Sequence, residues 1–151
     1  MRLNYLKTIL ISLILIMVII GCSAIESGFY IQKAELSKQV LKVGEDASLT
    51  VEIAKKTGRQ QIQHTARMEV KVISSSEDIV VIPTPTTSAE EVKNNNTLSV
   101  VARAGGVLPR PFKFKIKVKG SCKPGEYFLT IKATINKQED TKIINFKIEG
   151  G

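Results

Sequence analysis

The sequence has few of the residues that mark a disulfide scaffold, a metal centre or a hydrolytic site. It contains two cysteines, one histidine and no tryptophan among 151 residues. A disulfide scaffold of this size would carry more cysteines, and zinc ligands would form a spaced Cys/His cluster. Five phenylalanines and three tyrosines are also few. The core must therefore depend on Val, Ile and Leu, a composition that favours strands.

The single histidine gives no support to a hydrolytic enzyme. His64 lies in a glutamine-rich polar stretch without a companion motif, and we interpret it as a surface residue. The sequence has no glycine loop for phosphate binding either. We therefore expect a protein that is not an enzyme, with no cofactor and no metal site.

Acidic residues occur in four neighbouring pairs, and each pair falls in a predicted turn. We interpret them as solvated turn charge, because a calcium site would need several such loops to converge. Whether they do is left open by the sequence. The pairs are Glu45-Asp46, Glu77-Asp78, Glu90-Glu91 and Glu139-Asp140.

Basic residues exceed acidic ones, 22 to 14, for a formal net charge of +8. Such an excess favours anionic lipid head groups or acidic surface polymer as partners. A lysine-rich composition with no partner at all explains it equally simply. Nucleic acid is not expected, because the chain begins with an export signal.

That signal is an uncharged run from Thr8 to Ile20, preceded by Arg2 and Lys7. A basic start, an apolar stretch and small residues are the three parts of a signal peptide. From Thr8 to Ile25 the run is also of borderline length for a transmembrane helix, which needs roughly 20 residues. Cleavage and retention as an N-terminal hydrophobic helix both remain open. Either outcome places the rest of the chain outside the membrane, because the basic start stays in the cytoplasm.

The end of this run, Ile19-Ile20-Gly21-Cys22, resembles the lipobox of lipoprotein signal peptides. Ile19 replaces the usual leucine, and Ile20 is a permissive match. The resemblance implies that the Cys22 thiol takes a lipid and that the chain is cut before Cys22. The alternative is that Cys22 ends an uncleaved helix.

After residues 1–22 and a short tether, 23–28, the pattern predicts one β-sandwich domain over 29–151. Apolar and polar residues alternate at period two, which is typical of half-buried strands. Seven or eight short strands separated by polar turns predict an antiparallel, immunoglobulin-like sandwich. Residues 84–96 are predicted to form a loop, with one helical turn at Ala89–Lys93. The expected strands are Phe29–Leu36, Ala47–Ala54, Ala66–Val72, Ile79–Ile82, Thr97–Ala102, Phe112–Val118, Tyr127–Ile135 and Ile144–Ile148.

Two segments resemble immunoglobulin-like domains of archaeal S-layer-type and CARDB-like surface proteins. One is 41–53, with Val43-Gly44-Glu45 before a strand, and the other is 114–131, with Lys123-Pro124-Gly125-Glu126-Tyr127 between strands. In the second motif Pro124 presets a turn, Gly125 can take positive φ, and Tyr127 begins an inner face. The resemblance implies a fold and a cell-adhesion context, and it does not cover residues 84–107.

The strand 112–118 supplies a candidate basic face. Lys113, Lys115, Lys117 and Lys119 share one side of it, and Lys132 and Lys147 are candidates to join them. Such a face would suit anionic lipid or acidic glycan, whereas the simpler interpretation is a solvated face that deters edge pairing.

Two further residues have hypotheses of their own. Asn95 begins a glycosylation sequon, Asn95-Asn96-Thr97, in a predicted exposed loop. Cys122 is interpreted as a spare thiol.

Together these features predict a membrane-anchored cell-envelope protein with its domain on the extracytoplasmic side. The domain would act in binding, adhesion or structure, with other envelope proteins or an anionic surface polymer as partners. The alternatives are an envelope solute-binding lipoprotein, an enzyme accessory subunit, or a stator-type subunit of a surface filament.

Overall fold

The computed structural model describes residues 28–56, 62, 64–108 and 111–150. The predicted hydrophobic helix within 1–22, including Cys22, and the tether up to Ser27 lie outside the described residues. Within them all regular structure is β-strand. The ten strands are β1 Phe29–Leu36, β2 Val40–Lys42, β3 Asp46–Lys55, β4 Ala66–Ser74, β5 Ile79–Thr84, β6 Glu90–Asn94, β7 Thr97–Ala102, β8 Phe112–Val118, β9 Gly125–Ile135 and β10 Gln138–Glu149.

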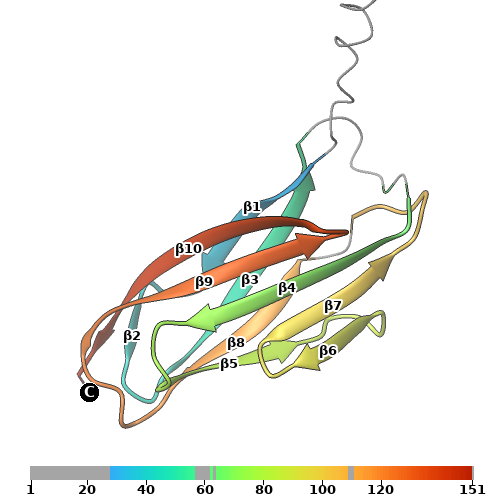
Figure 1. The fold of residues 1–151 in the computed structure, drawn as a ribbon. Coiled ribbons are helices and arrows are strands. Elements are labelled where there is room, and N and C mark those ends of the chain that lie inside the picture. Colours follow the sequence, from blue (N-terminus) through green and yellow to red (C-terminus); the bar gives the residue numbers. More distant parts are fainter. Residues whose placement is uncertain (1–27, 57–61, 63, 109–110, 151) are drawn as a thin grey trace, which may run out of the picture.

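The strands form two sheets that face each other as a sandwich, which confirms the predicted all-β, two-sheet class (Figure 1). Sheet A has the order β1-β3-β8-β5, and sheet B has the order β2-β10-β9-β4-β7-β6. Every pair but one is antiparallel. The exception is β2, which pairs in parallel with the end of β10, from Val40 beside Lys147 to Lys42 beside Glu149.

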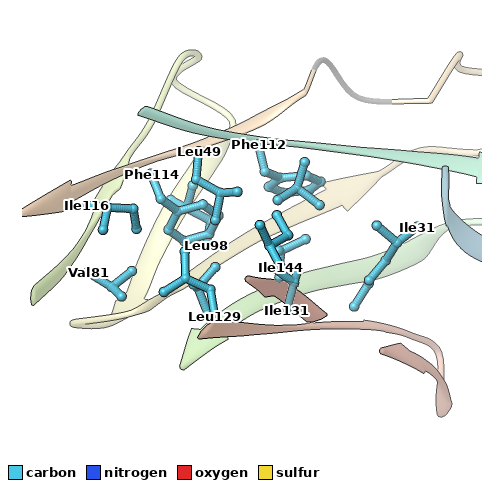
Figure 2. Packing of buried hydrophobic residues seen from close by; sticks show 14 of the residues in the cluster. Ile31, Leu49, Val81, Leu98, Phe112, Phe114, Ile116, Leu129, Ile131 and Ile144 are labelled. Carbon is cyan, nitrogen blue, oxygen red and sulfur yellow. The ribbon is translucent and has the colours of Figure 1, made fainter. Parts of the chain in front are cut away.

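The inner faces of both sheets supply one continuous hydrophobic core. Alternation at period two places successive side chains on opposite faces, so Phe112, Phe114 and Ile116 of β8 are buried while the lysines between them are exposed. Figure 2 shows these side chains pointing toward Leu129, Ile131 and Ile144 of sheet B. Val, Ile and Leu dominate this core, as the composition predicts.

Two strands differ from the sequence prediction. β6 replaces the predicted loop and the helical turn at Ala89–Lys93, because Glu90–Val92 pair with β7. β2 was not expected as a strand, since three residues carry too little pattern. Two of the four acidic pairs therefore lie in strands rather than turns, namely Glu90-Glu91 in β6 and Glu139-Asp140 in β10.

The backbone conformation at the turns differs in part from what the sequence predicts. Gly44 adopts φ 83° in the β2–β3 turn, where only glycine is unstrained. Gly125 does not have the positive φ expected of it, and it begins β9 instead. The β9–β10 hairpin turns at Asn136 and Lys137, with φ of 49° and 92°, so the connection is shorter than the one expected between strands 127–135 and 144–148.

The outer edges of sheet A are both occupied in part. At β1 the backbone N–H of Ile31 donates to Asp140 Oδ2 of β10 at 2.7 Å, and this hydrogen bond joins the two sheets. At β5, Ile79 N–H donates to Ser76 O and Ile79 O accepts from Ser74 Oγ. These contacts reduce the number of free backbone groups with which another strand could pair.

Candidate functional site

The lysine face consists of Lys113, Lys115 and Lys117 on β8, followed by Lys119 just after the strand. All four side chains are exposed on the outer side of sheet A. The strand holds them there because the residues between them are fixed in the core. The predicted projection of these four lysines from one face is thus seen in the structure, while their role stays a prediction.

Polar residues of β3 border the lysine face on one side. The cross-strand neighbours of Lys113, Lys115 and Lys117 are Thr50, Ser48 and Asp46. Lys115 Nζ lies 2.6 Å from Asp46 Oδ2, and both side chains are at least one-third exposed. An exposed pair of this kind contributes about 0 to 1 kcal/mol to stability. It therefore orients the Lys115 side chain but adds little to the stability of the fold.

The other side of the lysine face is apolar except for exposed Thr84, which lies beside Lys113. On β5, Val80 and Ile82 lie beside Lys117 and Lys115, and Ile82 is 40% exposed. Among the described residues, Lys113 and Lys117 have no ion-pair partner. The β5–β8 half of this face therefore combines uncompensated positive charge with exposed apolar surface, and it contains no acidic side chain in either strand.

Lys132 and Lys147 do not belong to this face, and their predicted inclusion was wrong. They lie on β9 and β10 in sheet B, on the opposite outer surface. Lys132 pairs with Glu139 at 3.1 Å and Lys147 with Glu149 at 2.9 Å. Alternation assigns a residue to a side of its own strand, but it does not tell which sheet that strand joins.

An open groove of about 790 Å³ lies between the β4–β5 turn and the β6–β7 turn. Ser75, Ser76 and Glu77 line one wall, and the other includes Asn94–Asn96. Asn95 is exposed at the β6–β7 turn, as the sequon hypothesis requires, and the Thr97 hydroxyl donates to Asn96 Oδ1 at 3.2 Å. Glycosylation of Asn95 stays a prediction.

The other residues singled out by sequence do not converge. Among the described residues, no three His, Cys, Asp or Glu side chains are grouped to hold a metal ion. Exposed His64 borders a smaller cavity of about 230 Å³ between β3 and the β9–β10 hairpin. Cys122 is a free, buried thiol at 4% exposure.

Tyr127 fulfils the structural role predicted for it. Its ring packs partly buried against the core, with the Phe146 ring centroid 6.2 Å away. Its hydroxyl donates to Lys123 O at 2.8 Å, which closes the turn before β9. A hydrogen bond with the Cys122 thiol, with some desolvation, holds the pKa of Tyr127 above its ordinary value.

None of the described residues forms a helix of the length and apolar character needed to span a membrane.

Comparison with known proteins shows the fold. No protein-family model matches the chain, and a search of curated proteins finds no significant match. Among solved structures, the third ScaB cohesin of R. flavefaciens, determined in complex with a group 1 dockerin, has a TM-score of 0.50 at 16% identity, covering 82% of this chain and 93% of its own. This chain therefore shares the β-sandwich fold of a cohesin.

Two further structures have lower similarity. A conjugative transposon lipoprotein from Bacteroides eggerthii has a TM-score of 0.46 at 8% identity, covering 78% of this chain and 95% of its own. The bacterial hydrophobin BslA has a TM-score of 0.47 at 11% identity, covering 81% of this chain and 100% of its own. The resemblance to archaeal S-layer-type and CARDB-like domains gains no support from these comparisons and stays a prediction.

Proposed function

We propose that this protein is a membrane-tethered module of the cell envelope whose β-sandwich binds an acidic partner through the lysine face. The single observation that supports this most is the β5–β8 half of sheet A. There Lys117 lies beside Val80 and Lys113 beside Thr84, both without described ion-pair partners, and exposed Ile82 lies diagonal to each of them, opposite Lys115. Positive charge next to exposed apolar surface suits a partner that is acidic and partly apolar, as protein surfaces often are.

The arrangement of the core supports a recognition role. The inner faces of both sheets are committed to packing, so the outer faces carry the groups that can meet a partner. β8 is a central strand of sheet A, held between β3 and β5, which fixes the spacing of the lysines. A rigid row of charges gives specificity and faster association more than raw affinity.

The cohesin comparison supplies a precedent for the fold. That structure contains a dockerin, so a sandwich of this kind serves as a protein-binding module in at least one protein. We propose the same class of role here, non-catalytic recognition of another envelope protein, in place of an enzymatic one.

Photo-crosslinking in the native cell tests the binding face. A photoreactive amino acid at Ser48, beside Lys115, samples the lysine face, and one at Thr141, beside Lys132, samples the outer surface of sheet B. We expect a discrete crosslinked product from position 48 only. The K113Q/K117Q variant should lose it, and K132Q/K147Q, with the same change in charge, should keep it.

The result has three informative outcomes. A product that survives K113Q/K117Q, or that forms equally from position 141, would contradict the assignment of the face. If the crosslinked product is an acidic polymer, the assignment of the binding face would stand, but the partner would be a polymer and not a protein. Partner-dependent recovery of the protein itself would favour the filament-subunit alternative.

Mass spectrometry of the native N-terminus tests the tether separately. A lipid-modified Cys22 as first residue is the expected result for a lipoprotein. An intact Met1 in a membrane fraction would indicate the spanning anchor instead. A cleaved, unmodified chain in the soluble fraction would remove the tether from the proposal.

A further inference from the structure

One end of the sandwich is strongly basic. We define the basic end by four exposed residues, Lys56 after β3, Arg67 near the start of β4, Arg103 after β7 and Lys137 in the β9–β10 turn. They come from four separate places in the sequence, and Figure 1 shows these strand ends gathered at the same end of the molecule. Among the described residues, none of the four has an ion-pair partner.

Backbone contacts hold this end together. Arg67 N–H donates to Asn136 Oδ1 at 3.2 Å, and Asn136 N–H donates to Arg67 O at 3.4 Å, which joins β4 to the hairpin that carries Lys137. Ile62 exchanges hydrogen bonds with Gly105 and Gly106, both at 2.8 Å, close to Arg103. The cavity of about 230 Å³ at this end is lined from both sheets, by Phe29 and Lys55 of sheet A and by Ala66 and Ile135 of sheet B. The basic residues are therefore presented by one assembled surface.

Two acidic residues near this end are already occupied, and a third, exposed Glu91, lines a shallow hollow together with Arg103. Glu139 pairs with Lys132, and Asp140 accepts a hydrogen bond from Ile31 N–H. The opposite end is balanced instead, because Glu45, Glu77, Asp78 and Glu149 lie there among Lys38, Lys42, Lys119 and Lys123. The domain therefore has a charge asymmetry along its long axis that its net charge alone does not reveal.

The chain leaves the domain toward residues 1–27 at this same basic end. Lys56 N–H donates to the carbonyl oxygen of Gly28, the first described residue, at 2.7 Å. The 27 residues that precede it include the apolar run from Thr8 to Ile20. If that run enters a membrane, Gly28 and the basic end are the parts of the domain nearest to the lipid.

We propose that the basic end docks on the anionic phosphate groups of the anchoring membrane and holds the domain upright. This inference rests on the membrane tether proposed above and adds a second contact to it. Each basic residue near an anionic surface strengthens binding by about 1 kcal/mol, or roughly fivefold. Four residues at one end, next to the point of attachment, give a strong orienting effect that falls with salt. The lysine face would then stand perpendicular to the membrane and meet partners from the side.

Hydrogen exchange of the full chain in nanodiscs tests the docking. One set of discs contains phosphatidylcholine alone, and the other contains phosphatidylcholine with phosphatidylglycerol. We expect slower exchange in the anionic discs for peptides covering 54–56, 64–68, 102–106 and 135–138, and no change for 37–45 and 119–124. High salt should remove the difference, because the contact is electrostatic.

Two matched variants make the test specific. K56Q/R103Q/K137Q removes three charges from the basic end and should weaken docking roughly a hundredfold, with loss of the protection. K38Q/K42Q/K123Q removes three charges from the opposite end and should leave the protection unchanged. Both variants alter only exposed side chains, so both should fold.

The outcomes separate this inference from the proposed tether. A chain that does not stay in either type of disc would contradict the tether itself. A chain that stays but shows no dependence on lipid charge, or that is protected along the lysine face, would overturn the docking at the basic end.

Discussion

Single residues at the β2–β3 turn set the conformation from which β3 begins. Gly44 lies at φ 83°, and a Cβ built there would meet no atom within 4 Å. The cost of adding a side chain is therefore purely conformational. We expect Gly44→Ala to lower the free energy of unfolding by about 1 to 2 kcal/mol, measured by chemical denaturation. Gly120→Ala is the control, since its surroundings are equally open and its φ is not in the left-handed region. Equal effects of the two changes would show that φ at Gly44 does not matter.

Glu45 makes the same turn sensitive to acid. Its carboxylate accepts hydrogen bonds from Lys38 Nζ at 2.6 Å and from Lys42 N–H at 2.8 Å. These two contacts, the lysine side chain first, hold the pKa of Glu45 below its ordinary value of 4.5. A lowered pKa in the folded state stabilises the fold above the unfolded pKa, and the stabilisation is lost as pH falls through the folded value.

We therefore expect wild type and Glu45→Gln to differ in unfolding free energy by a constant amount at neutral pH. The difference should shrink as the pH falls below about 4.5. Denaturation curves between pH 7 and pH 3 measure it. A difference that is independent of pH would mean that the charge of Glu45 makes no contribution.

How well the sequence anticipated the site depends on the residues involved. The lysine face follows directly from alternation, because Phe112, Phe114, Ile116 and Val118 are unambiguous core residues. The error at Lys132 and Lys147 arose because alternation carries no information about which strands become neighbours. The basic end was missed for the same reason, since its four residues are brought together only by the topology.

At the scale of elements, the long central strands and both edge strands of sheet A were predictable, whereas the edge strands of sheet B, β2 and β6, were not. β3, β4, β8 and β9 each bury most or all of one face, so their sequences alternate clearly. β6 has little to bury at its edge position, and Val92 remains 49% exposed. Its buried residue is Glu90, which accepts hydrogen bonds from the backbone N–H and hydroxyl of Thr86. A strand held by such polar contacts resembles a loop in sequence.

The edge strand β5 shows how one proline limits pairing with other chains. Lys119 N–H donates to Asp78 O at 2.9 Å, so alternation directs the backbone groups of Val80 and Ile82 toward β8. Those of Val81 and Pro83 then point to the free edge. Pro83 offers no N–H there, and the bonds to β8 are unaffected.

We expect Pro83→Val to expose a continuous edge and to promote self-association. Sedimentation velocity over a range of concentrations should show dimers or larger species that wild type lacks. Pro111→Val is a suitable control, because Pro111 lies outside the strands. A monomeric Pro83→Val variant would indicate that the contacts of Ile79 alone protect the edge.

At the scale of the molecule, two charged surfaces lie on different parts of one domain. The lysine face runs along the side of sheet A, whereas the basic end lies across the strand ends next to Gly28. The two surfaces would not keep their positions relative to each other if the two sheets moved independently. The core shared by both sheets is therefore what couples the two proposed contacts.

The largest fully buried side chains include Phe114, which is 1% exposed on β8. Truncating it to alanine removes a ring from the centre of the core and leaves a cavity. We expect Phe114→Ala to lower the free energy of unfolding by about 3 to 5 kcal/mol. Because one core serves both sheets, the loss should be shared by β3 in sheet A and β9 in sheet B, rather than confined to the strand that carries the change.

Hydrogen exchange of the most protected amides measures this, since their exchange reports global opening. Val107→Ala is the control, because Val107 is 76% exposed and its truncation should change stability by less than about 0.5 kcal/mol. A loss of protection in sheet A alone would mean that the sheets unfold separately. The lysine face could then loosen without disturbing the hairpin that carries Lys137, and the two proposed contacts would be independent.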